Sequence, residues 1–146
     1  MVAAPDNNKV IALEPEFITP QDGSVKQDCE LNAAKRWIER NSSLSTRKII
    51  IMGDDLFSRN PFCILLLTHC FHFVLVCKPS SHTTLYQHVS ALEKVDDITI
   101  ISRRKWNGQF HELHTYRYAN NLPLKQGDDA LSVNWAGLTV INTKTQ

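Results

Sequence analysis

The sequence predicts an α/β fold in which parallel strands with crossover helices are followed by an antiparallel, β-rich region. The first observation is a pair of short apolar runs, at 48–52 and 72–78, whose bulky and partly β-branched residues are typical of strands buried on both faces. The second is that apolar residues recur at helical spacing before, between and after these runs. A strand–helix–strand–helix order implies a parallel sheet with right-handed crossovers.

The third observation is a change of pattern after Lys94. The chain becomes rich in β-forming residues in "DITIISRRKW" and "FHELHTYRYA", which meet at Asn107-Gly108, a strong signal for a two-residue hairpin turn. A further strand or two is expected in "DALSVNWAGLTVINT". We therefore predict an α/β region over residues 1–94 and an antiparallel, β-rich region over 95–146.

The individual elements follow from apolar spacing and from capping and turn residues. We expect strands at 9–13, 48–52 and 72–78. The first helix is expected to begin between Ser24 and Asp28 and to end at about Arg40. A second helix should run from Asn60-Pro61 to about His69, and a third from Ser80 or Ser81 to Lys94. Asp28 or Ser24 could cap the first helix.

Composition narrows the class of protein. The chain has 146 residues, of which 42% are hydrophobic and 21% charged, so we expect it to bury a core. Its net charge of +1 gives no global signal for nucleic acid, so any DNA contact has to come from a local patch. Four cysteines without a CxxC pair favour reduced thiols, three of them in buried apolar surroundings, in a cytoplasmic protein. The longest apolar stretch is interrupted by Thr68, His69 and His72, which predicts no membrane span.

The end of the first apolar run raises a functional question. The run passes into Gly53 and then into two aspartates, Asp54 and Asp55. Open α/β sheets place their chemistry at the carboxyl edge of the strands, which is where these aspartates are expected. Gly53 would let the backbone turn sharply there. The alternative is that Asp55 begins a loop or caps the next helix.

Four phrases of the sequence carry a resemblance to a known family. They are "PQDGSVKQDCELNAAKRWI", "GDDLFSRNPFCILLL", "FVLVCKPSSHTTLY" and "RKWNGQFHELHTYRY…DALSVNW". In this order and spacing they resemble the DDE transposases of bacterial insertion sequences, over nearly the whole chain. The resemblance implies a partial RNase H-like core over residues 1–94, followed by the β-rich insertion that many such enzymes carry before their final catalytic helix.

The resemblance also implies an activity and a metal. The family cleaves DNA and transfers its strands with two divalent ions held by carboxylates, Mg²⁺ or Mn²⁺, and Asp54 matches its second metal-binding aspartate best. The first aspartate is expected upstream of Met1 and the final glutamate beyond Gln146. We therefore expect an internal fragment that binds metal weakly and is inactive alone. Its partners would be element ends and target DNA, and the intact family protein is expected to be oligomeric.

Two other classes compete with this interpretation. One is a non-catalytic DNA-binding or interaction remnant that modulates a full-length transposase. The other is a small flavodoxin-like binding domain, which ranks lowest because "EPEFITPQDG" is not a glycine-rich phosphate loop.

Several cations are candidates for DNA contact. Three of them, Arg103, Arg104 and Lys105, precede the predicted turn, and Arg117 follows it, interleaved with aromatic residues. They could hold the DNA backbone. An ordinary solvated sheet face explains the same pattern equally well. Lys78 follows the second parallel strand and could approach a phosphate, although a simple loop is the favoured alternative.

Histidines and cysteines offer a weaker candidate for a metal site. His69, Cys70, His72, Cys77 and His82 fall across a helix end, a strand and a loop, so their side chains should diverge. A structural role is therefore favoured over zinc binding.

Overall fold

The computed structural model describes residues 1–4, 8–18 and 28–143 and divides the chain into two compact units, Met1–Val76 (unit 1) and Cys77–Gln146 (unit 2). The described strands form one parallel and two antiparallel sheets beside the helices, so the mixed α/β class is confirmed. The functional division between residues 94 and 95 stays a prediction. None of the described helices has the length and apolar character needed to cross a membrane.

Unit 1 contains most of the helical structure. Its elements are β1 (Val2–Ala3), β2 (Val10–Ile11), α1 (Glu30–Arg40), a 3-10 helix (Ser42–Arg47), β3 (Ile50–Gly53), α2 (Asn60–Thr68) and β4 (His72–Leu75). The strand expected at 9–13 is reduced to β2, which pairs with β1 in an antiparallel ladder of two residue pairs. Both β2 side chains are exposed, so no core packing extends this ladder.

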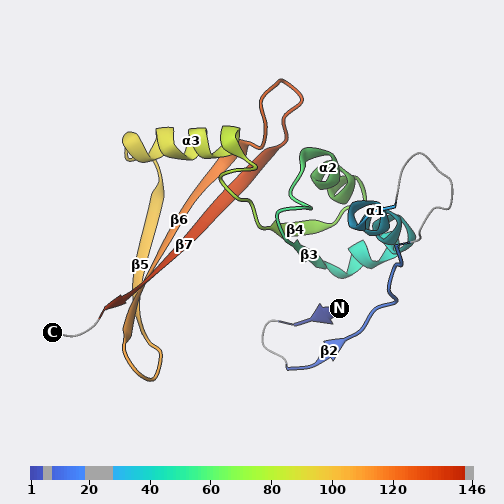
Figure 1. Cartoon of the computed structure of the whole chain (residues 1–146), viewed down its shortest axis with the longest axis horizontal. Helices are drawn as coiled ribbons and strands as arrows, with labels where there is room; N and C mark the ends of the chain where they lie inside the picture. Colours follow the sequence, from blue (N-terminus) through green and yellow to red (C-terminus); the bar gives the residue numbers. More distant parts are fainter. Residues whose placement is uncertain (5–7, 19–27, 144–146) are drawn as a thin grey trace. The chain divides into compact units, whose positions relative to one another are not determined.

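The predicted parallel pair is confirmed by β3 and β4. Their register runs from Ile50 beside His72 to Gly53 beside Leu75. Helices α1 and α2 pack on the sheet around a core cluster of buried residues. Its members are Ile38, Phe62, Leu66 and Phe71, with Ile51, Phe73 and Leu75 of the strands packed against it. Figure 1 shows the two helices beside the β3–β4 pair.

The other face of this sheet is open within the described part of unit 1. The side chains of Ile50, Met52, Val74 and Val76 are 56%, 78%, 59% and 56% exposed. The prediction that β3 is buried on both faces is therefore wrong. Side chains alternate along a strand, and the core cluster takes only every second one.

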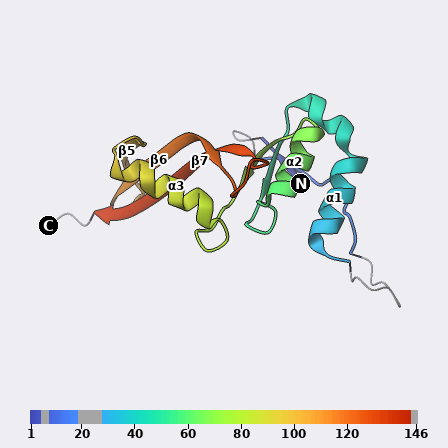
Figure 2. The same ribbon diagram turned by 90° about the horizontal axis from the view of Figure 1, so that it is seen from above.

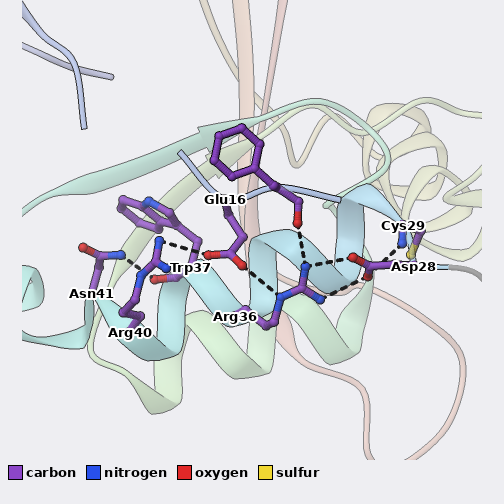
Figure 3. A network of polar contacts seen from close by, with 8 residues as sticks. Glu16, Asp28, Cys29, Arg36, Trp37, Arg40 and Asn41 are labelled. Atoms are coloured by element: carbon purple, nitrogen blue, oxygen red, sulfur yellow. Dashed lines mark hydrogen bonds and ion pairs between the residues drawn. The ribbon is translucent and has the colours of Figure 1, made fainter. Parts of the chain in front are cut away.

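The start of α1 differs from the expected capping arrangement. Ser24 lies outside the described residues. Asp28 does not cap the helix, since the N-cap residue is Cys29 and it has no side-chain cap. The Asp28 carboxylate instead accepts hydrogen bonds from Arg36 Nη1 and Nη2 at 3.0 and 2.8 Å and from the adjacent Cys29 N–H at 3.0 Å. Arg36 Nε also donates to Glu16 at 3.0 Å, and Arg40 pairs with the same carboxylate at 2.9 Å (Figure 3). These contacts hold the extended segment before the helix against α1.

The ionic character of Arg36 follows from this network. Hydrogen bonds to Asp28 and then to Glu16 raise the pKa of Arg36, so its guanidinium stays charged at any pH at which the chain is folded. Nη2 also donates to the carbonyl of Phe17 at 3.0 Å. One arginine therefore satisfies two acids and one backbone oxygen from segments far apart in the sequence.

Unit 2 is a helix on a three-stranded sheet. Its elements are α3 (Thr83–Lys94), β5 (Thr99–Trp106), β6 (His111–Pro123) and β7 (Ser132–Thr143). The strands are antiparallel in the order β5-β6-β7, and the last segment forms one strand where one or two were expected. Figures 1 and 2 show α3 on one face of this sheet, across one end of it, while the β5–β6 hairpin extends beyond the helix.

The hairpin turn forms where it was predicted but is centred one residue later. The ladder ends at Trp106 beside His111, and the Asn107 N–H donates to the Phe110 carbonyl at 3.2 Å. The side-chain oxygen of Asn107 accepts the N–H groups of Gln109 and Phe110, each at 2.9 Å. Because Asn107 acts as this local acceptor, the turn places Gly108 at its first central position, with φ +98°.

Candidate functional site

Asp54 lies where the sequence predicted, directly after β3 at the carboxyl end of the parallel pair. It is exposed. Its carboxylate Oδ1 accepts the Leu56 N–H at 3.0 Å, and its carbonyl accepts the Phe57 N–H at 3.2 Å. These two bonds form a local turn of the kind that aspartate side chains favour. Asp54 can therefore serve the turn and still present its carboxylate to solvent.

Asp55 and Ser58 support the same turn. The Ser58 hydroxyl donates to the Asp55 carbonyl at 2.8 Å, and Ser58 is only 3% exposed. The helix that follows begins after Arg59 and has no side-chain cap. Of the two alternatives for Asp55, the loop is therefore confirmed and the helix cap is wrong.

Gly53 has a packing role instead of the expected sharp turn. The positive-φ glycines of the described residues are Gly108 and Gly127, so Gly53 is not in the left-handed region. A Cβ added at Gly53 would lie 3.0 Å from Leu75 Cδ2 and 3.2 Å from Phe57 Cδ2. The missing side chain thus lets the loop after β3 fold back closely onto the sheet.

A cavity of about 180 Å³ lies beside this loop in unit 1. Trp37, Ile51, Gly53, Phe57 and Leu75 contribute to its lining, which is almost entirely apolar. This lining offers no set of polar groups that could hold a phosphate or a cation, and Asp54 is not part of it.

The donor set near Asp54 does not fit a two-metal centre. Two ions held about 3.5–4 Å apart need several carboxylates from separate chain positions. In the described ranges no group of three or more His, Cys, Asp or Glu side chains could hold a metal ion. This statement covers the histidine and cysteine candidates as well as Asp54. The described residues alone therefore do not supply a two-metal centre.

The cysteines differ from the expected environments. Cys63 is buried, but Cys29 and Cys70 are exposed and Cys77 is intermediate. The expectation of three buried thiols is therefore wrong. Burial raises the pKa of the Cys63 thiol to about 11, which keeps it protonated and unreactive. Cys70 follows His69, the C-cap residue of α2, and adopts a left-handed conformation with φ 58°.

The basic residues of the hairpin are divided between the two faces of the sheet. Residues paired directly across antiparallel strands share a face, and neighbours along a strand alternate. Arg104 pairs with Leu113 on the face that α3 covers, while Arg103 and Lys105 pair with His114 and Glu112 on the opposite face. All three cations of β5 are exposed.

Arg117 faces α3, in contrast to Arg103 and Lys105. Its Nη1 donates to Glu93 of α3, and its guanidinium lies over the Trp135 ring, 5.8 Å from the centroid. Tyr86 of α3 meets the same ring edge-on at 6.0 Å. Arg117 thus takes part in attaching the helix to the sheet, and its use in DNA binding stays a prediction.

Glu93, Tyr86 and Trp135 were not predicted from the sequence. The available signal was the β-rich segment "SVNWAGLTV", because residues two apart on a strand share a face and Trp135 and Gly137 therefore lie together. The partner of Glu93, in the last turn of α3, could not be predicted, because Arg117 lies 24 residues further along the chain.

Lys78 lies at the start of unit 2 and is exposed. Its carbonyl accepts the N–H groups of Ser81 and His82 at 3.1 and 3.0 Å, which forms the turn before α3. This turn confirms the loop, and the approach of Lys78 to a phosphate stays a prediction.

Comparisons with family models, with curated proteins and with solved structures find no match to this chain.

Proposed function

We propose that the chain is part of a DDE transposase of the bacterial insertion-sequence type, with a partial RNase H-like core over residues 1–94 and a DNA-contacting, β-rich insertion over residues 95–146. The observation that carries the proposal is the β3–α2–β4 arrangement, in which an exposed aspartate directly follows the first of two parallel strands. This is the edge at which open α/β sheets place functional groups. Asp54 is the proposed metal-binding carboxylate.

The open face of the β3–β4 sheet is a second supporting feature. Parallel sheets are normally covered on both faces, because crossover connections place helices on them. Here Ile50, Met52, Val74 and Val76 leave one apolar face exposed within the described part of unit 1. An RNase H-like core with a further layer would bury these four side chains.

The proposal has a direct test in the DNA on either side of this reading frame. We expect codons for an aspartate-bearing strand upstream and for a helix with a Tyr-Arg-Glu-Lys type motif downstream. Flanking DNA that encodes neither would contradict the transposase assignment. The DNA-binding role proposed for unit 2 does not depend on that result and is tested separately, by DNA-binding measurements.

An activity assay tests the role of Asp54. Purified protein is incubated with labelled DNA and Mg²⁺ or Mn²⁺, beside the Asp54→Ala variant. One carboxylate position does not hold two metals, so we expect no cleavage by this chain alone. Cleavage that is lost in Asp54→Ala would mean that the chain supplies a complete catalytic site.

A second candidate function is a non-catalytic DNA-binding or interaction module that modulates a full transposase. It is favoured by the run of exposed cations at 103–105 on an edge strand that extends past α3. Its DNA affinity would fall steeply with salt and would be unchanged by Asp54→Ala.

A further inference from the structure

The sheet of unit 2 has one face that α3 leaves uncovered, and the central strand places two tyrosines on it. Tyr116 and Tyr118 are 41% and 37% exposed, although both lie in the middle strand. Tyr116 stands between Ile101 of β5 and Leu138 of β7 in one cross-strand row. We call this surface the tyrosine face and define it by Tyr116, Tyr118, Ile101, Arg103, Leu138 and Val140.

We infer that the tyrosine face binds single-stranded nucleic acid, with the two tyrosine rings stacking on bases. This inference rests on the proposal that unit 2 contacts nucleic acid, and it names the form that is bound. The two tyrosines are separated by one residue on the same strand face, about 6.8 Å along the strand. Each ring can therefore take a different base.

The charges on this face are complementary to a phosphate backbone. Arg103 and Lys105 are exposed at the β5 edge of the face. Among the described strand residues on this face, the one carboxylate is that of Glu112. It accepts a hydrogen bond from the Asn107 side-chain amide at 2.7 Å and contacts His114 Nε2 at 2.8 Å. Glu112 lies directly across from Lys105 and partly offsets its charge, whereas Arg103 lies across from His114. Both cations border the aromatic rings on one side.

The apolar content of the face favours a single strand over a duplex. In a duplex the bases are stacked inside and phosphates line the outside, so Ile101, Leu138 and Val140 would meet charged groups. These three side chains are 42%, 55% and 45% exposed. Unpaired bases present apolar faces that can cover them, while the backbone runs along the cations at the edge.

The test measures fluorescence anisotropy of a labelled oligothymidylate of about 15 nucleotides, with an oligouridylate and a DNA duplex as further probes. We expect tighter binding to the single strands than to the duplex. Tyr116→Leu or Tyr118→Leu should each weaken single-strand binding by about fivefold or more, because each removes a stacking surface. Tyr116→Phe and Tyr118→Phe keep the ring and should retain affinity.

The matched control is Trp106→Leu. Trp106 is 55% exposed and lies on the same sheet but on the opposite face, where it contacts His111 with ring centroids 4.9 Å apart. We expect a change of less than about twofold. Arg103→Gln should lower the salt dependence of single-strand binding by about 0.7 in log–log slope, as for one lost phosphate contact.

Several outcomes would overturn the inference. Unchanged affinity in the leucine variants, or an equal loss in Trp106→Leu, would remove the tyrosine face from the binding site. Preference for the duplex would refute the single-strand form and leave the proposed DNA contact intact, whereas no binding to any probe would refute both. Leucine variants that alter only the oligomeric state in sedimentation would identify a second copy of the chain as the occupant.

Discussion

Gly137 of β7 is a site at which one added methyl group should loosen unit 2. An ideal Cβ at this position would lie 2.8 Å from Cη2 and 2.9 Å from Cζ2 of Trp135. The indole ring therefore lies across the glycine, and it fills the space that a side chain would occupy. Trp135 is 6% exposed and is held by the edge contact with Tyr86 and by the guanidinium of Arg117.

The expected magnitude for Gly137→Ala follows from these distances. Carbon atoms normally pack about 3.5–4.0 Å apart, so the ring has to move by about 1 Å. Overpacking of this kind costs about 1–3 kcal/mol. Weakening the Tyr86–Trp135 contact adds up to about 1.5 kcal/mol. Alanine gains about 0.5–1 kcal/mol over glycine in a strand, so the middle values of these ranges combine to a net destabilisation of about 2 kcal/mol, and we expect about 1–3 kcal/mol.

Hydrogen exchange measured by mass spectrometry is the suitable assay, because it reports on each unit separately. Amides of α3 and β7 should exchange about 5- to 150-fold faster in Gly137→Ala, as a net loss of 1–3 kcal/mol implies. Amides of β3 and β4 in unit 1 serve as the internal control and should be unchanged.

The Trp135→Leu background provides the decisive comparison. Without the ring nothing obstructs the new methyl group, so Gly137→Ala should become neutral or slightly stabilising there. The reasoning would be refuted if Gly137→Ala had no effect in the native background. An equal destabilisation in the Trp135→Leu background would refute it as well.

Two further predictions concern titratable groups. Exposed Cys29 and Cys70 should react with a thiol reagent at pH 8 long before Cys63 does. Burial and a pKa of about 11 protect the Cys63 thiol until unit 1 opens. Labelling of Cys63 at the same rate as Cys70 would contradict the buried core. Hydrogen bonds, first with His114 and then with Asn107, hold the pKa of Glu112 below its ordinary value of 4.5. The ionised Glu112 therefore stabilises the folded state above pH 4.5, and this stabilisation is lost as the pH falls through the lowered pKa. The protection of the hairpin-turn amides, taken relative to their intrinsic exchange rate at each pH, should therefore fall at acidic pH in the native chain and not in Glu112→Gln.

The parts of the fold that could be predicted from the sequence are those set by local spacing. The β3–β4 pair, its two packing helices and the hairpin after Lys94 all follow from the apolar period and from turn residues. The errors arose where long-range contacts override local signals. Asp28 is a good helix cap in isolation, but Arg36 offers its carboxylate a stronger, charged partner eight residues along.

The candidate site shows the same limit. The position of Asp54 at the end of a parallel strand could be predicted, because strand direction follows from the order of elements. The role of Gly53 could not, since it depends on Leu75 and Phe57 closing over it. A glycine before an aspartate therefore indicates that a side chain is not tolerated at that position. It does not indicate whether the reason is a positive φ or, as at Gly53, close packing of neighbouring side chains.

The basic hairpin shows why a cluster in the sequence need not be a cluster in space. Arg103, Arg104 and Lys105 are consecutive, and a strand necessarily sends the middle one to the other face. Arg117 then faces α3 because it shares the parity of Arg104 through the antiparallel register. A ligand on one face of this sheet meets Arg103 and Lys105 together, whereas a ligand that uses all four cations has to wrap around the β5 edge. The two arrangements differ in salt dependence, because the first engages two phosphates and the second up to four.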